Sequence, residues 1–374
     1  MADSILEHFA DLPDPRGARG KLHRLGDVLT IAICAVICGA DGWVAVEHFA
    51  RAKEQWFGTF LDLPGGIPGH DTFGRVFAAI DPDAFERCFA GWTKALGGSS
   101  RGKLVAIDGK SLRRSFAHAW DKSGMAHLVS AFVSDNRLVL GQLAVDAKAN
   151  EIVAIPRLLA LLDPTGATVS IDAIGCQKGI ARSILDAGAN YVLAVKENQK
   201  TLHAQVKKLL DEAILEKFHG MAHAAFEGTD GDHGRVETRR AWCTGEVQWV
   251  KCGGQWPGLA SVGVVECVRE VIGGPTSTER RYYISSLDGT DAEAFAAAVR
   301  GHWGVENPLH WSLDVTFGED DSRVRKGHAA QNLSRLRRIA LNQLQRDKTL
   351  KAGIQTKRQR AGWDHAYLLK VLAS

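Results

Sequence analysis

Hydrophobic and polar positions follow a helical spacing over residues 1–98. Residues 25–38 are apolar on most faces and predict a buried helix, and residues 43–60 predict an amphipathic one. An Asp-Pro pair separates two further helical stretches, 72–80 and 83–96, because proline can begin a helix but not continue one. We therefore predict an N-terminal helical domain, whose short helices suit either DNA binding or packing and oligomerisation.

The spacing changes after a glycine- and serine-rich linker, GGSSRGK. Runs rich in β-branched residues then predict strands at 104–107, 127–133, 137–145, 168–171 and 190–195. Helical spacing between and after the later strands predicts helices at 151–162, 178–187 and 199–217. A hairpin followed by strand–helix crossovers implies an α/β fold, with a mixed sheet flanked by helices.

Strand-forming runs dominate residues 218–285, where we expect an inserted β-rich subdomain. Helical spacing returns at 291–303 and 333–346; the second helix carries leucines on one side and arginines on the other. The predicted parts are the N-terminal helical domain 1–98, the first part of the core 99–217, the β-rich insertion 218–285, the second part of the core 286–346, and a basic C-terminal tail 347–374.

Gly304 and Pro308 disturb the helical pattern near Glu306. Proline lacks an N–H donor and clashes with the preceding turn of a helix. Either the helix kinks there, or Asn307 caps a new helix with Pro308 at its first position.

Composition excludes several classes of protein. The chain has 374 residues, 45% of them hydrophobic and 24% charged, with a net charge of only +3. Its seven cysteines are scattered without a CxxC pair, so neither a zinc ribbon nor a disulfide framework is indicated, and Cys34 and Cys38 suit burial in a helix better than a metal or redox pair. No signal peptide is evident, and the most apolar run, 28–40, falls short of the roughly 18–20 residues that span a bilayer. We expect a cytoplasmic protein with no membrane partner.

Charge is clustered near the C-terminal end. Residues 301–322 contain no Lys or Arg but five carboxylates: Glu306, Asp314, Glu319, Asp320 and Asp321. Residues 323–360 contain twelve Lys or Arg and one acid. An acidic site beside a cationic surface suits a protein that binds divalent metal next to a polyanion such as DNA.

Two upstream acids are candidate partners of Glu306. Asp108 and Asp172 each follow a short β-branched strand, and the carboxyl ends of adjacent strands converge on one edge of an open sheet. Three such carboxylates can hold two Mg²⁺ ions, which activate a water or 3′-hydroxyl and stabilise the leaving oxygen of a phosphodiester. Each Asp could instead form a turn or cap a helix.

A different metal set is also open. His302, Glu306 and His310 are four residues apart in turn and could share a helical face, which would suit zinc. Trp303 and Trp311 in the same stretch could stack on a flipped base, or pack in the core.

Many segments together resemble the DDE transposases of bacterial insertion sequences, in the H-repeat-associated group. The segments are HFADLPDPRGARGKLHRLGDVLTIAICAVICGADGW, IPGHDTFGRVFAAIDPDAF, AIDGKSLRRS, KANEIVAIPRLL, IDAIGCQKGIA, YVLAVKENQ, HGRVETRR, RYYISSL and HWGVENPLHWSLDVTFGEDDSRVRKGHAAQNLSRLRRIALN. The resemblance covers nearly the whole chain, and it is the combination of segments that is specific.

The resemblance implies a ribonuclease-H-like catalytic core with its acids at Asp108, Asp172 and Glu306, and an insertion of β-strands between the second and third acid. It implies hydrolysis at the ends of a mobile element, followed by attack of the freed 3′-hydroxyl on target DNA. The implied cofactor is Mg²⁺ or Mn²⁺, as two ions. The implied partners are double-stranded DNA, as terminal inverted repeats and target, and a second copy of the chain, on the bacterial nucleoid.

Candidate DNA contacts are polar residues near the acids or on the insertion: Lys110, Arg113, Arg114, Lys196, Asn198, Arg235, Arg239, Arg240, His302, Arg323, Arg325 and Lys326. Solvated surface charge is the alternative role for these side chains.

One departure from related transposases stands out. Related enzymes often place Tyr, Arg and Lys around the glutamate, at positions that here hold Val299, His302 and Leu313. Arg323, Arg325 and Lys326 are candidate substitutes. The departure leaves two alternatives: a degenerate relative that binds DNA without cutting it, and a metal-dependent nuclease without strand transfer.

Overall fold

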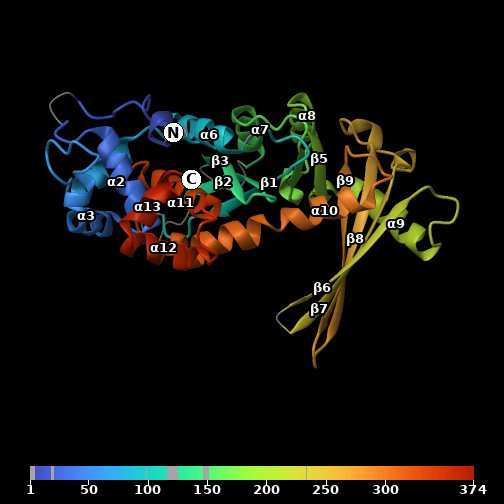
Figure 1. The fold of residues 1–374 in the computed structure, drawn as a ribbon. Helices are drawn as coiled ribbons and strands as arrows, with labels where there is room; N and C mark the ends of the chain where they lie inside the picture. The colour runs from blue at the N-terminus through green and yellow to red at the C-terminus, as the bar shows by residue number, and fades with distance from the viewer. Residues whose placement is uncertain (1–4, 18–20, 98, 116–124, 146–150, 233) are drawn as a thin grey trace.

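The computed structural model describes residues 5–17, 21–97, 99–115, 125–145, 151–232 and 234–374. Nine strands form one sheet in the order β3-β2-β1-β4-β5-β9-β8-β7-β6 (Figure 1). Helices cover both faces of the half that contains β1 to β5, and a helical lobe lies beyond β3 (Figure 1). The prediction of a mixed α/β fold with a helix-flanked sheet is therefore confirmed.

The first half of the sheet consists of β1 (Leu104–Ser111), β2 (His127–Val133), β3 (Leu138–Val145), β4 (Thr168–Ile171) and β5 (Asn190–Val195). β1 is antiparallel to β2 and parallel to β4, and β4 is parallel to β5. β1 is longer than predicted: Asp108 to Ser111 continue to pair with β2 after β4 has ended at Ile171. Asp108 therefore lies within a strand and not in the turn after one.

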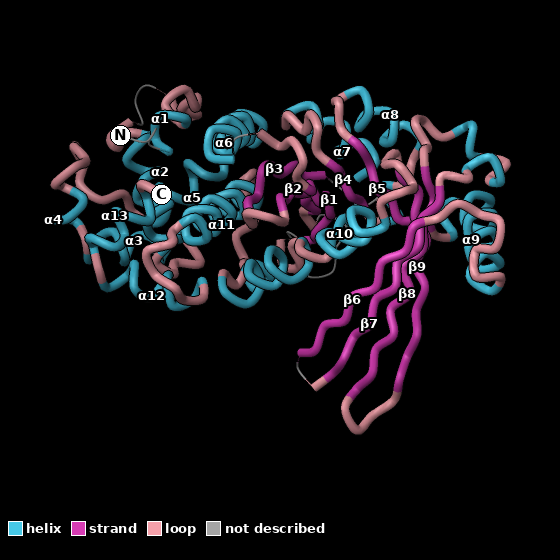
Figure 2. Tube along the Cα trace, turned by 45° about the vertical axis from the view of Figure 1, so that its right-hand side comes forward, coloured by secondary structure: helices cyan, strands magenta, loops and turns pink. Residues whose placement is uncertain are grey.

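The second half consists of β6 (Ala224–Asp232), β7 (Arg235–Thr244), β8 (Ser261–Val271) and β9 (Thr276–Ser285), all antiparallel. Their far ends project from the body as a long ribbon (Figure 2). β9 pairs with β5 from Val192–Ser285 to Val195–Tyr282. The β-rich segment expected as an inserted sheet thus continues the central sheet.

The helical lobe combines both ends of the chain. Its N-terminal helices are α1 (Ile5–His8), α2 (Leu25–Ile37), α3 (Trp43–Ala52), α4 (Glu54–Phe57), α5 (His70–Ala79) and α6 (Pro82–Gly97). Its C-terminal helices are α11 (Ala329–Arg346), α12 (Ile354–Trp363) and α13 (His365–Leu372). The segment expected as a basic tail forms α12 and α13, in which Ala361, Leu368 and Val371 are buried in the same core as α2 and α11.

The remaining helices flank the sheet. They are α7 (Glu151–Leu161), α8 (Lys178–Asp186), α9 (Lys200–Leu215), α10 (Ala292–His302) and a π-helical segment, Val305–Thr316, that follows α10. No helix in the described part of the chain is long and apolar enough to cross a membrane.

Successive side chains of β1 point to opposite faces of the sheet, and this alternation decides which face the candidate site occupies. Val105 and Ile107 pack with α7 and α8 in one core, whereas Ala106 packs with Phe132 and Val305 in another. Since side chains two residues apart in a strand share a face, Asp108 points to the same side as Ala106. This is the side on which the helix carrying Glu306 lies.

Candidate active site

Asp108 is the centre of the candidate site. Burial raises the pKa of Asp108 to about 7, against a hydrogen bond from the Gly109 N–H, and the charges of Asp172, Glu151 and Glu306 raise it further. Asp172 and Glu306 are therefore within electrostatic reach of Asp108. A nearby cation would stabilise the charged form of a carboxyl group in this environment.

Asp172 is placed beside Asp108 by strand pairing. Ile107 of β1 is in register with Ile171 of β4, so each aspartate is the next residue on a parallel neighbour. One Asp172 oxygen, Oδ1, accepts hydrogen bonds from the N–H groups of Ile174 (3.0 Å) and Gly175 (3.4 Å). Asp172 thus also caps the turn that follows it, and these hydrogen bonds orient its carboxylate.

Glu306 is on the π-helical segment Val305–Thr316 and is exposed. The prediction that Asn307 caps a new helix is wrong, because the π-helical segment begins at Val305 and Pro308 lies inside it. A wider winding accommodates a residue that cannot donate to the carbonyl four positions earlier. At its end the Phe317 N–H donates to the Ser312 carbonyl, five residues back, at 3.2 Å.

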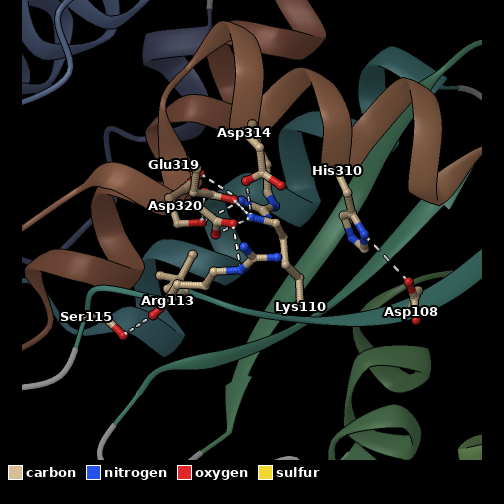
Figure 3. Close-up of polar contacts among 11 residues, drawn as sticks. Asp108, Lys110, Arg113, Ser115, His310, Asp314, Glu319 and Asp320 are labelled. Carbon is tan, nitrogen blue, oxygen red and sulfur yellow. Dashed lines mark hydrogen bonds and ion pairs between the residues drawn. The ribbon is translucent and has the colours of Figure 1, made fainter. Parts of the chain in front are cut away.

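The two histidines of the possible zinc set have other neighbours. The His302 Nδ1 lies 3.1 Å from the Ser170 hydroxyl, and burial lowers the pKa of His302 although the Asp172 charge opposes this. The His310 Nδ1 lies 3.6 Å from Asp108 Oδ2 (Figure 3). Burial, with the positive charges of Arg338 and Lys110, lowers the pKa of His310 to about 3, so this imidazole is neutral. Among the residues that the structure describes, no three His, Cys, Asp or Glu side chains are already arranged as metal ligands.

Lys110 lies at the centre of an acidic cluster. Its ammonium pairs with Asp314, and it lies 3.0 Å from Asp320 Oδ1 and 3.5 Å from Glu319 Oε2 (Figure 3). Burial would raise the pKa of Glu319, but the charges of Arg338 and Lys110 outweigh burial and lower it to about 2. Lys110 was a candidate DNA contact, yet its side chain is only 9% exposed and is already surrounded by carboxylates.

The cluster changes the interpretation of the acidic stretch 301–322. Asp314, Glu319 and Asp320 pair with Lys110, and Asp321 pairs with Arg114 at 3.2 Å. Within the described part of the chain, Glu306 is the one carboxylate of the five with no ion pair. The stretch as a whole is therefore an ion-paired structure and not a pool of metal ligands.

The sequence predicted a cationic face on α11, and this second prediction is wrong. Arg335, Arg337 and Arg338 are buried, because α11 packs against α2, α5, α6 and β3. Arg335 pairs with Glu86 at 2.8 Å, and Arg338 with Glu319 at 3.0 Å. Their acidic partners are far away in sequence, which is why the helix pattern did not reveal the burial.

The remaining candidate DNA contacts fall into three groups. Lys196 and Asn198 are exposed just beyond β5, where the Asn198 amide donates to the Ala173 carbonyl beside Asp172. Arg323, Arg325 and Lys326 are exposed between the π-helical segment and α11, and the Arg325 guanidinium donates to the Arg114 carbonyl at 2.8 Å.

The third group is on the projecting ribbon and next to the acidic cluster, and all its arginines form ion pairs. The pairs are Arg113–Asp320 (3.1 Å), Arg235–Glu237 (3.1 Å), Arg239–Asp230 (2.6 Å) and Arg240–Glu227 (2.6 Å).

A buried network on the other face of β1 was not predicted. His127 Nδ1 lies 2.8 Å from the Ser111 hydroxyl, and His127 Nε2 contacts Glu151. Gly109 leaves room for this network, since a Cβ there would lie 2.5 Å from Glu151 Oε1. Glu151 is a charged residue directly before the apolar run IVAI, and that was the available signal.

Residues 99–343 match the family described as Transposase DDE domain, and residues 6–93 match the one described as DDE_Tnp_1-associated. The chain is 40% identical over 376 residues to the "H repeat-associated putative transposase YhhI" of Escherichia coli (strain K12), covering 99% of this chain and 97% of that one. It is 39% identical over 374 residues to the "Putative transposase YncI" of Escherichia coli O157:H7, covering 99% and 95%. Among solved structures, a piggyBac transposase synaptic complex with hairpin DNA aligns over 96% of this chain and 81% of that one, at 9% identity; its TM-score of 0.35 is too low to carry an argument.

Proposed function

We propose that this chain, which belongs to the family of DDE transposases, uses Asp108, Asp172 and Glu306 to hold the metal ions with which it cuts and transfers DNA strands. The observation that carries the proposal is the parallel pairing of β1 with β4, in which Asp108 and Asp172 follow the paired Ile107 and Ile171, with Glu306 close enough to raise the pKa of Asp108. Acids that repel one another in a partly buried site are typical of a cation site.

The residues present fit Mg²⁺ or Mn²⁺. Carboxylate oxygens are the ligands that these hard cations prefer, and we propose that the three carboxylates hold two ions. When bound, such ions activate a water or a 3′-hydroxyl and stabilise the leaving oxygen of a phosphodiester. The exposed side chain of Glu306 can turn while its helix is held, which suits a ligand set that is completed on binding.

The chain's own residues prepare this site. Asp172 is oriented by its hydrogen bonds to the turn that follows it, and neutral His310 packs against Asp108 without adding a charge. Lys196 and Asn198 lie on the side of Asp172 and are our candidates for holding a phosphate there. We also propose that β1 to β5 with their helices are a ribonuclease-H-like core, and that two copies act on paired DNA ends.

The test is Asp108→Asn. We expect this variant to lose metal-dependent cleavage of DNA carrying the element's ends, yet to bind that DNA as the wild type does, because the lost charge serves the metal. Gel-shift binding and cleavage with Mg²⁺ or Mn²⁺ measure the two properties separately. Lys94→Met, at an exposed lysine that pairs with Asp163, is the control for folding and general charge. Undiminished cleavage by Asp108→Asn would refute the assignment.

Two alternatives are tested alongside this proposal, and one of them has an observation behind it. Val299 and Leu313 are buried apolar residues where related enzymes often carry Tyr and Lys, which favours a degenerate DNA-binding relative. Metal-dependent nicking that the triple alanine variant of Asp108, Asp172 and Glu306 lacks would exclude that relative. A nuclease without strand transfer is excluded if joined products, and not only cut ends, are detected.

A further inference from the structure

Lys110 connects the two elements that carry Asp108 and Glu306. It follows Asp108 by two residues on β1, so both side chains are on the same face of the sheet. Its ammonium meets Asp314 on the π-helical segment, and Glu319 and Asp320 in the turn that follows (Figure 3). One cation on the strand of Asp108 thus binds one carboxylate on the helix of Glu306 and two in the turn that follows this helix.

The same turn is fixed from a second direction. Glu319 is 1% exposed, accepts a hydrogen bond from the Ser334 hydroxyl at 2.6 Å and pairs with Arg338 at 3.0 Å. Ser334 and Arg338 are on α11. The far end of the Glu306 helix is therefore held between β1 and α11.

The near end of this helix has its own anchors. His302 contacts the Ser170 hydroxyl on β4, and the Ser134 hydroxyl donates to the Gly301 carbonyl at 2.7 Å. Val305, Leu309 and Leu313 are buried along one side. Glu306 itself has no ion pair among the described residues, so its backbone position depends on these two ends.

We propose that Lys110 is a positioning residue, which holds the helix of Glu306 against the strand of Asp108 through Asp314, Glu319 and Asp320. This inference rests on the proposed function, in which Glu306 and Asp108 share metal ions. It replaces the earlier expectation of a DNA contact, because a phosphate approaching Lys110 would meet the three carboxylates first.

The positive charge of the Lys110 ammonium offsets the repulsion among the carboxylates around it. Without it, Asp314 and Glu319 would lose their cation on the β1 side, and Asp320 would keep only Arg113 at 3.1 Å. Removing one partner of a buried ion-pair cluster leaves uncompensated charge, which is strongly unfavourable. The turn would then move away from β1 and take the helix with it.

The experiment compares Lys110→Met, which keeps the length of the side chain, with Lys110→Arg, which keeps its charge. Lys94→Met is the matched control, because Lys94 also pairs with an aspartate but is exposed and remote from the site. Asp314→Asn is a second variant in case Lys110→Met does not fold; it weakens the cluster while Glu319 and Asp320 still bind Lys110.

Hydrogen exchange on the full-length, metal-free proteins is the first measurement. We expect the amides of residues 305–321 to exchange at least about tenfold faster in Lys110→Met, with no change in β5, whereas a merely global loss of stability would accelerate both. Lys110→Arg should restore most of the protection, and Asp314→Asn should be intermediate. Unchanged exchange of residues 305–321 in both Lys110→Met and Asp314→Asn overturns the inference.

Binding of Mn²⁺ alone, followed by electron paramagnetic resonance, is the second measurement. We expect Lys110→Met to weaken it by about 10- to 100-fold, as for other residues that orient metal ligands, and Lys110→Arg to recover part of the loss. Asp108→Asn separates the two proposals. If Asp108→Asn leaves Mn²⁺ binding intact, the proposed metal site is overturned, and the exchange result still decides whether Lys110 holds the helix.

Discussion

At the scale of single residues, environment matters more than residue type. Asp108 and Asp172 directly follow paired residues of β1 and β4, yet Asp108 continues its strand whereas Asp172 caps the turn after β4. Lys110 and Lys196 were equivalent candidates for DNA, yet Lys110 is buried among carboxylates and Lys196 is exposed. Residues of one type at one end of a sheet therefore have different surroundings.

The raised pKa of Asp108 predicts how pH affects the metal-free protein. The pKa rises from 3.8 to about 7 on folding, so the folded protein keeps a proton that the unfolded chain loses. This contribution to stability is complete below about pH 4 and is lost as pH rises through about 7. In EDTA at pH 8 we expect Asp108→Asn to be more stable than the wild type, on the order of 1–4 kcal/mol, and the two to converge towards pH 4. Urea unfolding at several pH values measures this; a pH-independent difference would contradict it.

At the scale of elements, the π-helical segment Val305–Thr316 is the least regular part and carries Glu306. Pro308 lies inside it, and its buried row of Val305, Leu309 and Leu313 packs in the same core as α11. Widened helical turns occur often at functional sites.

We predict that Pro308→Ala lowers the rate of metal-dependent cleavage by at least about tenfold, because a displacement of about 1 Å in a catalytic group can cost 10²-fold. Alanine restores an N–H donor, so the segment can wind more tightly and turn Glu306. Stability should stay the same or rise, since proline is unfavourable inside a helix. Pro156→Ala in α7 is the control, because Pro156 also lies inside a helix but on the other face of the sheet. Equal losses of cleavage in the two variants would contradict a local effect of Pro308.

At the scale of the whole molecule, the hydrophobic cores do not follow the boundaries expected from the sequence. One core contains Phe77 and Phe85 from the N-terminal helices, Phe132 from the sheet, and Leu336 and Leu368 from the C-terminal helices. A buried pair, Glu86 of α6 with Arg335 of α11, lies where these parts meet. Glu86 Oε1 also accepts a hydrogen bond from the Gln142 N–H of β3 at 2.7 Å.

We predict that Arg335→Met destabilises the whole chain by about 3–5 kcal/mol, because it leaves Glu86 buried without its cation. Adding Glu86→Gln should recover part of this loss, since the remaining group is uncharged. Arg157→Ala, at an exposed pair with Asp83, should change stability by less than about 1 kcal/mol. Urea unfolding measures all four proteins, and a loss confined to the N-terminal helices would contradict a shared core.

Local patterns in the sequence predicted most of the elements and singled out the three candidate acids. Strand-forming runs before Asp108 and Asp172 predicted neighbouring strands, and periodic apolar positions predicted most helices, because these signals depend on residues close together in the chain. They also carried the resemblance to DDE transposases, whose residues span nearly the whole length.

Tertiary structure decided which charges are free. Lys110, Arg335 and Arg338 look like surface cations in the sequence, and Asp314, Glu319 and Asp320 look like metal ligands. Their pairing joins residues 19 to 249 positions apart, so no local window contains both partners. Burial and ion pairing depend on the packing of β1, α6 and α11 around one another, and that packing separates Glu306 from the other acids of its stretch.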